Sequence, residues 1–385
     1  MTVGWDEASD VASWAGLPPL DGDTSADACV IGLGGSGLAA VESSVDRGLS
    51  VVAVDAGRIA AGAAGRNGGF LLGGPDAYLH SAIDAWGAEA AVWLYRATLR
   101  ELDHLAALVP DVVNRVGSIR LAGLPGDPES AQEADDHARE LRDCALHEAA
   151  LVEHGIAVEQ YDGSLGRGLY LPDDAAMNPA RRAIGLASLL RRRARLHEHT
   201  RVLEVRPEQV VTEHGTVTAR VVIAALDGRL DVLFPQLAAR VRTARLQMIA
   251  TAPVSRGRLH CPVYGRWGYD YAQQLPDGRL FVGGGRDRFE AHEWTTDATP
   301  TDEVQRYIEH IAARFASAPV SVTHRWAASV GFTGGDGRAL CTAVDDGIVA
   351  IGGYNGTGNL VGPVAARAAV ALAVDGTTPP RCFAS

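Results

Sequence analysis

Residues 27–57 read DACVIGLGGSGLAAVESSVDRGLSVVAVDAG, and this stretch decides the fold. An apolar run leads into a glycine-rich turn, a helix-like pattern follows, and a second apolar run ends the unit. Gly32 permits a tight turn, Gly34 lets the backbone approach a pyrophosphate, and Gly37 lets the helix pack closely on the strand. The order predicts a dinucleotide-binding unit whose phosphate contacts are Gly32, Gly34, Gly35, Ser36 and Gly37.

An acid ends the second apolar run at Asp55, followed by Ala56. A carboxylate at this position can accept hydrogen bonds from ribose hydroxyls, and the helix N-terminus offers N–H groups to the phosphates. No arginine beside it favours a 2′-phosphate, so NADP is the least expected dinucleotide. The fingerprint alone leaves NAD and FAD open.

The next segment, AGAAGRNGGF at 61–70, favours an extended ligand over NAD. A pure NAD-binding unit would continue into another crossover helix and parallel strand. Here a polar, glycine-rich loop follows, in which Arg66 could neutralise phosphate and Asn67 could hydrogen-bond the edge of a heterocycle. A surface loop without a ligand is the alternative.

The run Gly65-Arg66-Asn67-Gly68-Gly69 resembles the flavin-contacting loop of the D-amino-acid oxidase (DAO) superfamily of FAD-dependent oxidoreductases. The approach at 18–23 is similar to the leader of the γ-glutamylputrescine oxidoreductase branch, and glycine oxidases are also similar. Weaker matches follow in family order at Asn178-Pro179, at Val202 and Val205 ahead of the run ending at Ala225, at 276–285, at 324–337 and at 351–363.

The last of these matches, IGGYNGTGNLVGP at 351–363, resembles the loop at the flavin edge. Its N–H groups at the start of the last helix can face the N1–C2=O edge, which gains negative charge on reduction. The two glycine loops are thus expected to hold opposite ends of one FAD. The resemblance implies cofactor contacts at Gly32, Gly34, Gly35, Ser36, Gly37, Asp55, Ala56, Gly65, Arg66, Asn67, Gly68, Gly69, Val202, Ala225, Gly353, Asn355, Gly356, Thr357, Gly358 and Asn359.

Flavin attachment and substrate recognition depart from parts of the family pattern. The cysteine to which sarcosine-oxidase relatives attach flavin is missing, since Cys341 follows Asp336, so we expect non-covalent FAD. The arginine that clamps a substrate carboxylate is also missing ahead of Asp336. We therefore expect an amine or N-substituted compound without an α-carboxylate at that position, although Arg245, Arg266 or Arg286 could take the place of the missing arginine. Two smaller departures are Ala339 in place of a common proline and Thr357 in place of a common histidine.

Aromatic residues in the β-rich block are the expected substrate contacts. Alternation places Trp267, Tyr269 and Tyr271 on one face of a predicted strand, where they could pack against an amine through apolar and cation–π contact. Tyr354 is expected at the substrate side of the ring. Packing of a sheet core explains the same aromatic residues equally well.

The order of elements predicts an α/β (α+β) protein with two interleaved domains. After a leader at 1–24, a Rossmann-like FAD-binding domain comprises 25–75, 165–235 and 325–385. A substrate domain, with a mostly antiparallel sheet and helices, comprises 76–164 and 236–324. Helices are expected at 84–109, 127–150, from Asn178 to about 195, at 300–316 and at 361–374.

Bulk properties exclude several classes of function. The net charge of −12 argues against nucleic acid and anionic membrane as partners. Five scattered cysteines, the absence of a signal-like N-terminus and the absence of a long apolar run indicate a cytoplasmic protein. The pair His197-x-His199 is not a convincing metal site.

The expected activity is the oxidation of a C–N bond of a small amine to an imine by hydride transfer to flavin N5. Oxygen is the expected acceptor, giving hydrogen peroxide. An amino-acid oxidase, a dehydrogenase with another electron acceptor, a non-catalytic flavin-binding protein and an NAD-linked dehydrogenase are the alternatives.

Overall fold

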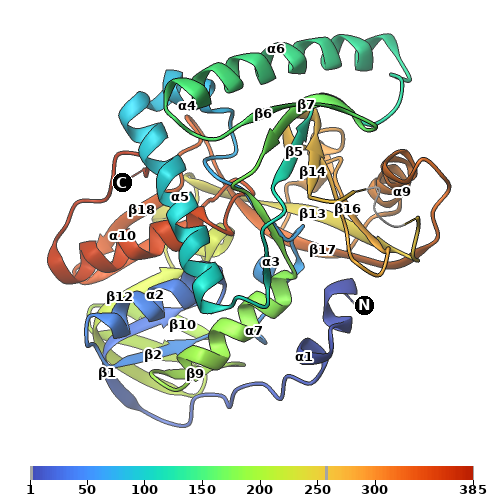
Figure 1. The fold of residues 1–385 in the computed structure, drawn as a ribbon. Coiled ribbons are helices and arrows are strands. Elements are labelled where there is room, and N and C mark those ends of the chain that lie inside the picture. Colours follow the sequence, from blue (N-terminus) through green and yellow to red (C-terminus); the bar gives the residue numbers. More distant parts are fainter. Residues whose placement is uncertain (1–2, 256–258, 385) are drawn as a thin grey trace.

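A computed structural model describes residues 3–255 and 259–384, which form two large sheets and one small one (Figure 1). The first sheet has the order β10-β11-β12-β1-β2-β9, with β19 beside β12 and β18 beside β19. Its strands are β1 (Thr24–Ile31), β2 (Val51–Val54), β9 (Arg195–His197), β10 (Val202–Arg206), β11 (Gln209–Thr212), β12 (Gly215–Ala225), β18 (Leu340–Asp345) and β19 (Ile348–Gly352).

Parallel pairing fixes the nucleotide-binding half. Strand β1 pairs in parallel with β12 and β2, β2 pairs with β9, and β12 pairs with β19. Such crossovers require helices, and α2 (Gly35–Asp46), α7 (Pro179–Leu190) and α10 (Val361–Asp375) pack in this half (Figure 1). Asn178 caps α7, because its side chain accepts from the N–H groups of Ala180 and Arg181.

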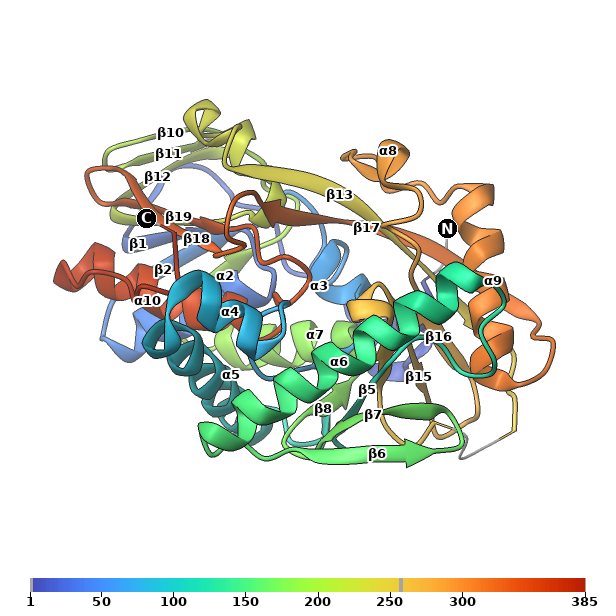
Figure 2. The ribbon, with the colours of Figure 1, turned by 90° about the horizontal axis from the view of Figure 1, so that it is seen from above.

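The second sheet is mostly antiparallel and has the order β17-β13-β16-β15-β14-β5-β7-β6. Its two longest strands, β13 and β17, run side by side from the first sheet toward the far end of the molecule (Figure 2). Its strands are β5 (Ser118–Leu121), β6 (Glu159–Gly163), β7 (Gly166–Leu171), β13 (Val241–Thr251), β14 (Val263–Gly265), β15 (Asp270–Gln274), β16 (Leu280–Gly283) and β17 (Val322–Thr333).

A small third sheet and the remaining helices complete the fold. The third sheet has the order β3-β8-β4. The elements are β3 (Phe70–Leu71), β4 (Val113–Asn114), β8 (Ala175–Met177), α1 (Ser9–Ala12), α3 (Ala63–Arg66), α4 (Leu79–Trp86), α5 (Ala88–Leu108), α6 (Ala131–Glu153), α8 (Glu290–Glu293), α9 (Asp302–Ala316) and the short 3-10 turns η1 (Gly4–Glu7), η2 (Asp227–Val232), η3 (Pro235–Leu237) and η4 (Arg266–Gly268).

The predicted fold class is confirmed, with a parallel nucleotide-binding sheet and a mostly antiparallel second sheet. Two predicted helix bounds were wrong. The helix expected at 84–109 is broken into α4 and α5 at Gly87. Its φ of 82° is non-helical, and glycine adopts such a value without steric strain. The helix α7 ends at Leu190, and Arg195 already belongs to β9.

Two strands of the second sheet lie wholly or mostly in ranges that the sequence assigned to the FAD-binding domain. Strand β7 lies within 165–235 and most of β17 lies after 325, yet both pair in the second sheet. The N-terminal leader also packs into the fold, since Trp5 stacks on Phe281 with ring centroids 3.8 Å apart. In the described part of the chain no helix is long and apolar enough to cross a membrane.

Candidate active site

The first glycine turn joins β1 to α2 and leaves no space for a side chain at Gly32 or Gly37. Gly32 has φ 93°, and a Cβ there would lie 2.6 Å from the carbonyl oxygen of Ala225, at the end of β12. A Cβ on Gly37 would lie 1.8 Å from the carbonyl oxygen of Gly32. The turn and the close helix–strand contact therefore require glycine, and the N-terminus of α2 is left open to an anion.

The carboxylate of Asp55 lies against this turn. Its Oδ2 accepts from the N–H of Leu33 (2.8 Å), and its Oδ1 accepts from the N–H of Gly57 (2.8 Å). Burial raises the pKa of Asp55, and these two hydrogen bonds counter the rise. Ala56 follows it. The N–H of Thr200 donates to the carbonyl oxygen of Asp55 (2.7 Å), and Val202 begins the edge strand β10 two residues later.

The segment after β2 folds into the short helix α3 rather than an open loop. The side chain of Asn67 faces the second glycine loop, because Asn67 and Asn359 exchange amide hydrogen bonds of 3.2 and 3.0 Å. Asn67 Oδ1 also accepts from the N–H of Gly69 (2.8 Å). The segment 65–69 and the second glycine loop, far apart in sequence, thus meet through one pair of amides.

The second loop is held by a residue that sequence reasoning missed. Asp227, just after β12, accepts from the N–H groups of Gly353 (3.0 Å) and Gly331 (2.7 Å). Asn355 has φ 54° and bonds the backbone of Thr333 and Gly337. The position of an acid at the end of a strand was the only available signal, because its partners are distant in sequence. The hydroxyl of Thr357 donates to the carbonyl of Tyr354 (2.8 Å).

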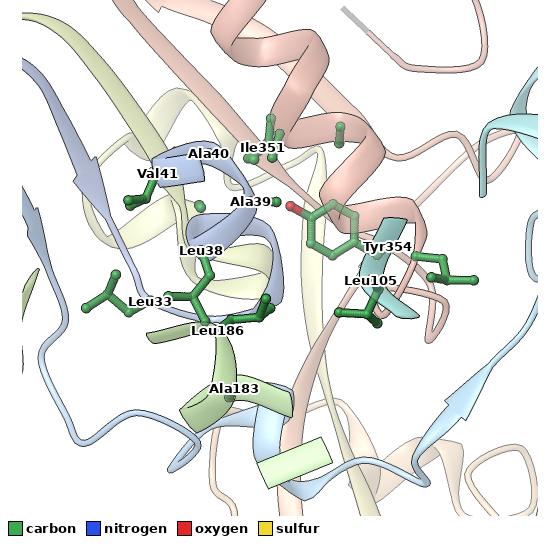
Figure 3. Close-up of a cluster of buried hydrophobic side chains, with 14 of the residues drawn as sticks. Leu33, Leu38, Ala39, Ala40, Val41, Leu105, Ala183, Leu186, Ile351 and Tyr354 are labelled. Carbon is green, nitrogen blue, oxygen red and sulfur yellow. The ribbon is translucent and has the colours of Figure 1, made fainter. Parts of the chain in front are cut away.

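Tyr354 lies away from the expected substrate position. Figure 3 shows its ring directed into the buried cluster against α2, and only 5% of the residue is exposed. A Cβ on Gly358 would lie 3.1 Å from this ring. Burial raises the pKa of Tyr354 well above its usual value, and the side chain packs beneath the second loop.

A cavity of about 450 Å³ opens beside the segment 66–68 and the second glycine loop. One wall is formed by Arg66, Asn67 and Gly68 together with Asn355, Gly356, Thr357 and Asn359. The lining also includes a set of aromatic residues, Phe70, Tyr264, Trp267, Tyr269, Tyr271 and Phe332. A cavity lined by polar loop residues and by aromatic rings can hold a flat ring together with a small apolar substrate.

Trp267, Tyr269 and Tyr271 line one cavity, but they do not lie on one face of a strand as the alternation predicted. Only Tyr271 lies on a strand, β15, whereas Trp267 belongs to the turn η4 with φ 57° and Tyr269 follows that turn. Trp267 is fixed by Glu140, which accepts from its N–H, and by Asp143, which accepts from Nε1 (2.7 Å). The turn, rather than strand alternation, brings the three rings to one cavity.

The charged groups of the cavity were not all visible in the sequence. Among the described lining residues the only carboxylate is Asp76, whose side chain is exposed in the cavity. Desolvation by the surrounding protein raises its pKa to about 6, with backbone hydrogen bonds and the charges of Arg120 and Arg286 countering the rise. Arg120 is buried, donates from Nε to the hydroxyl of Tyr264 (3.1 Å) and stacks over Tyr78. Asp76 and Arg120 lie in no recognisable motif.

The three candidate arginines differ in their surroundings. Arg245 is paired with Glu293 (2.8 Å), and Arg266 is paired with Asp270 (2.6 Å), so both are already neutralised. Arg286 lines the cavity and stacks on Phe332, with its guanidinium carbon 4.4 Å from the ring centroid. Within residues 3–255 and 259–384 it forms no ion pair.

Comparisons with known proteins agree with this geometry. A family model described as FAD dependent oxidoreductase (DAO) matches residues 27–372. The probable oxidoreductase OrdL of Rhizobium meliloti is 26% identical over 388 residues, which cover 94% of this chain and 86% of that protein. The γ-glutamylputrescine oxidoreductase of Escherichia coli is 27% identical over 301 residues, covering 72% and 68%. The crystal structure of glycine oxidase from Geobacillus kaustophilus has the same fold, with a TM-score of 0.72 at 19% identity over 92% of this chain and 96% of that one.

Proposed function

The chain belongs to the DAO family of FAD-dependent oxidoreductases, and on that premise we propose that it oxidises a carbon–nitrogen single bond of a small amine or N-substituted compound to an imine. A bound FAD supplies the redox chemistry, because its flavin ring takes up a hydride equivalent at N5. The observation that carries the proposal is the cavity lined by the segment 66–68, the second glycine loop and the aromatic residues, with Asp76 as its carboxylate.

The residues present fit this cofactor. The glycine turn leaves no space for a Cβ at Gly32 and Gly37, and Asp55 lies where ribose hydroxyls would donate to it. The second loop offers backbone N–H groups beside the cavity. Gly32, Gly34, Gly35, Ser36, Gly37 and Asp55 would hold the nucleotide half, and Asn67, Gly356, Thr357 and Asn359 the flavin half.

Non-covalent attachment is part of the proposal. All five cysteines are buried and free in the structure, and Cys341 lies in β18 with its Sγ 3.9 Å from the carbonyl oxygen of Ala365 in α10. That places its sulfur on the helix side of the strand, away from the aromatic cavity. Cysteine is therefore poorly placed for a bond to the flavin.

The aromatic residues of the cavity would bind the substrate, and Asp76 would accept its proton. The rings of Trp267, Tyr269 and Tyr271 exclude water and pack against apolar or cationic groups. The Asp76 carboxylate pairs with the substrate's ammonium and accepts its proton, which leaves the nitrogen lone pair free to form the C=N bond as the hydride leaves the neighbouring carbon. The aldehyde or ketone then follows by hydrolysis of the imine.

A second candidate, an amino-acid substrate, is favoured by Arg286. This guanidinium lies in the cavity wall without an acidic partner among the described residues, and it could bind a carboxylate in place of the arginine missing before Asp336. Under this reading the substrate's two charged ends face Asp76 and Arg286.

Oxygen consumption over a panel of amines, N-methylated amines and amino acids tests the proposal. We expect at least one compound to give hydrogen peroxide in equal amount to the oxygen consumed. Flavin reduction by a compound without oxygen consumption would indicate another electron acceptor. A yellow protein whose flavin no compound reduces would instead be a non-catalytic flavin-binding protein.

A further inference from the structure

The side chain of Arg182, on α7, is buried near the first glycine turn and lacks an acidic partner in the described chain. Only 2% of the residue is exposed. Its Nη2 donates to the carbonyl oxygen of Asn359 (3.0 Å) and its Nη1 to Asn359 Oδ1 (3.4 Å), while Nε has no hydrogen-bond partner among the described residues. Burial lowers the pKa of Arg182 to about 10, so the guanidinium remains charged at neutral pH.

The nearest acids are already used by other cations. Glu101 and Glu42 line the same small cavity as Arg182, between α2, α5 and α7. Glu101 accepts from Arg367 (2.8 Å), and Glu42 accepts from Arg367 (2.9 Å) and pairs with His104 (2.9 Å). A buried cation without a contacting anion is unfavourable, so the position of Arg182 needs an explanation.

Its position relative to the glycine turn supplies one. Nη1 lies 2.6 Å from the point where a Cβ on Gly35 would stand, and Gly35 is the first residue of the 12-residue helix α2. Figure 3 shows the neighbouring α7 residues Ala183 and Leu186 packed toward Leu38 of α2. The guanidinium thus lies beside the free N–H groups of this helix, where both the helix dipole and its own charge attract an anion.

We propose that Arg182 provides the positive charge that compensates the pyrophosphate of bound FAD, and that through Asn359 it joins this contact to the flavin-edge loop. The inference rests on FAD as the cofactor of the proposed function. It adds a residue from α7, outside both glycine loops, to the cofactor site. Without FAD the guanidinium is uncompensated, and with FAD it has an anion.

Thermal unfolding and ligand affinity of the apoprotein test the proposal with Arg182→Met, which removes the charge at similar volume. We expect its affinity for FAD and for ADP to fall by roughly ten- to a hundredfold, the effect of losing a charge-assisted hydrogen bond, while its affinity for riboflavin, which has no phosphate, stays unchanged. The apoprotein should unfold at the same temperature as wild type or higher, since an unpaired buried charge is gone. Arg182→Lys should recover part of the ADP affinity.

The matched control is Arg181→Met, which alters the half-buried neighbour that pairs with Asp10 (2.6 Å) and should leave all three affinities unchanged. The proposal is overturned if Arg182→Met binds FAD and ADP as wild type does. It is equally overturned if its apoprotein is less stable than wild type or fails to fold, because Arg182 would then serve the fold itself. Wild-type apoprotein that binds neither FAD nor ADP would contradict the proposed function as well, which separates the two failures.

Discussion

At the scale of single residues, Asp76 carries the proposed proton chemistry, and its environment sets a pH dependence. Desolvation by the surrounding protein raises its pKa to about 6, although the side chain is exposed in the cavity, and the charged, proton-accepting form is the active one. The rate constant of flavin reduction should therefore increase as the pH rises through about 6, and it should decrease steadily as the pH falls below about 6.

Asp76→Asn should remove this limb and slow anaerobic flavin reduction by about a hundredfold, the usual contribution of a general base. Stopped-flow measurement of flavin bleaching between pH 5 and 8 checks it, with the exposed Asp173→Asn as control. An acid limb shared by Asp76→Asn and wild type would show that another group titrates.

Also at the scale of single residues, a substitution of Arg286 tests whether the substrate is an amine or an amino acid. Arg286→Gln should raise KM for substrates with a carboxylate by roughly tenfold or more and leave amines without one unchanged, because only the former lose a charge-assisted hydrogen bond. Steady-state kinetics on an amine and the matching amino acid measure this, with the exposed Arg288→Gln as control. Equal KM changes for both compounds would mean that Arg286 acts through the shape of the cavity alone.

At the scale of elements, the turn between β1 and α2 was predictable because its requirements are local. Gly37 needs contact only with Gly32 and β12, and the strand–turn–helix pattern encodes that contact in one stretch of sequence. The pair Asn67 and Asn359 was not predictable in the same way. Each lay in a recognised loop, but the hydrogen bonds between them depend on how α3 and the second loop meet in space.

Gly37→Ala tests the turn. A Cβ 1.8 Å from the Gly32 carbonyl must displace either the helix or the strand, at a cost of about 2 kcal/mol or more in the free energy of unfolding. We expect a lower denaturant midpoint and loss of copurifying FAD. Gly62→Ala, at a position where a Cβ would meet nothing within 4 Å, is the control and should behave as wild type. An unchanged midpoint and flavin content in Gly37→Ala would show that the turn tolerates a side chain.

At the scale of the whole molecule, the two sheets were predictable from the order of elements. The contacts that bring residues from different parts of the chain together around the cavity were not. The aromatic residues at 267, 269 and 271 suggested a strand face, and the structure brings them together through a left-handed turn that no periodicity reveals. Trp5 is similar. Its segment reads as a leader, yet it stacks on Phe281 of β16 and donates to the carbonyl of Asn67 (2.9 Å), linking the N-terminus, the second sheet and the cofactor loop.

Trp5→Ala should therefore lower the free energy of unfolding by about 3 kcal/mol, as expected for a fully buried aromatic side chain, and also weaken FAD binding. Chemical denaturation and FAD titration of the apoprotein measure the two effects. Trp93→Ala, at a 39% exposed position, is the control and should change neither by much. A destabilised Trp5→Ala protein with normal FAD affinity would show that Trp5 stabilises the core but does not position the loop around Asn67 for FAD.

The central claim, that this molecule is a flavin-dependent oxidoreductase acting on C–N bonds, is tested most directly by anaerobic titration of the purified yellow protein with amines and amino acids. We predict that at least one compound bleaches the flavin absorption fully, and that acid or heat then releases free FAD from the protein. Flavin absorption that no amine or amino acid changes, or a colourless protein that cannot be reconstituted with FAD, would contradict the claim.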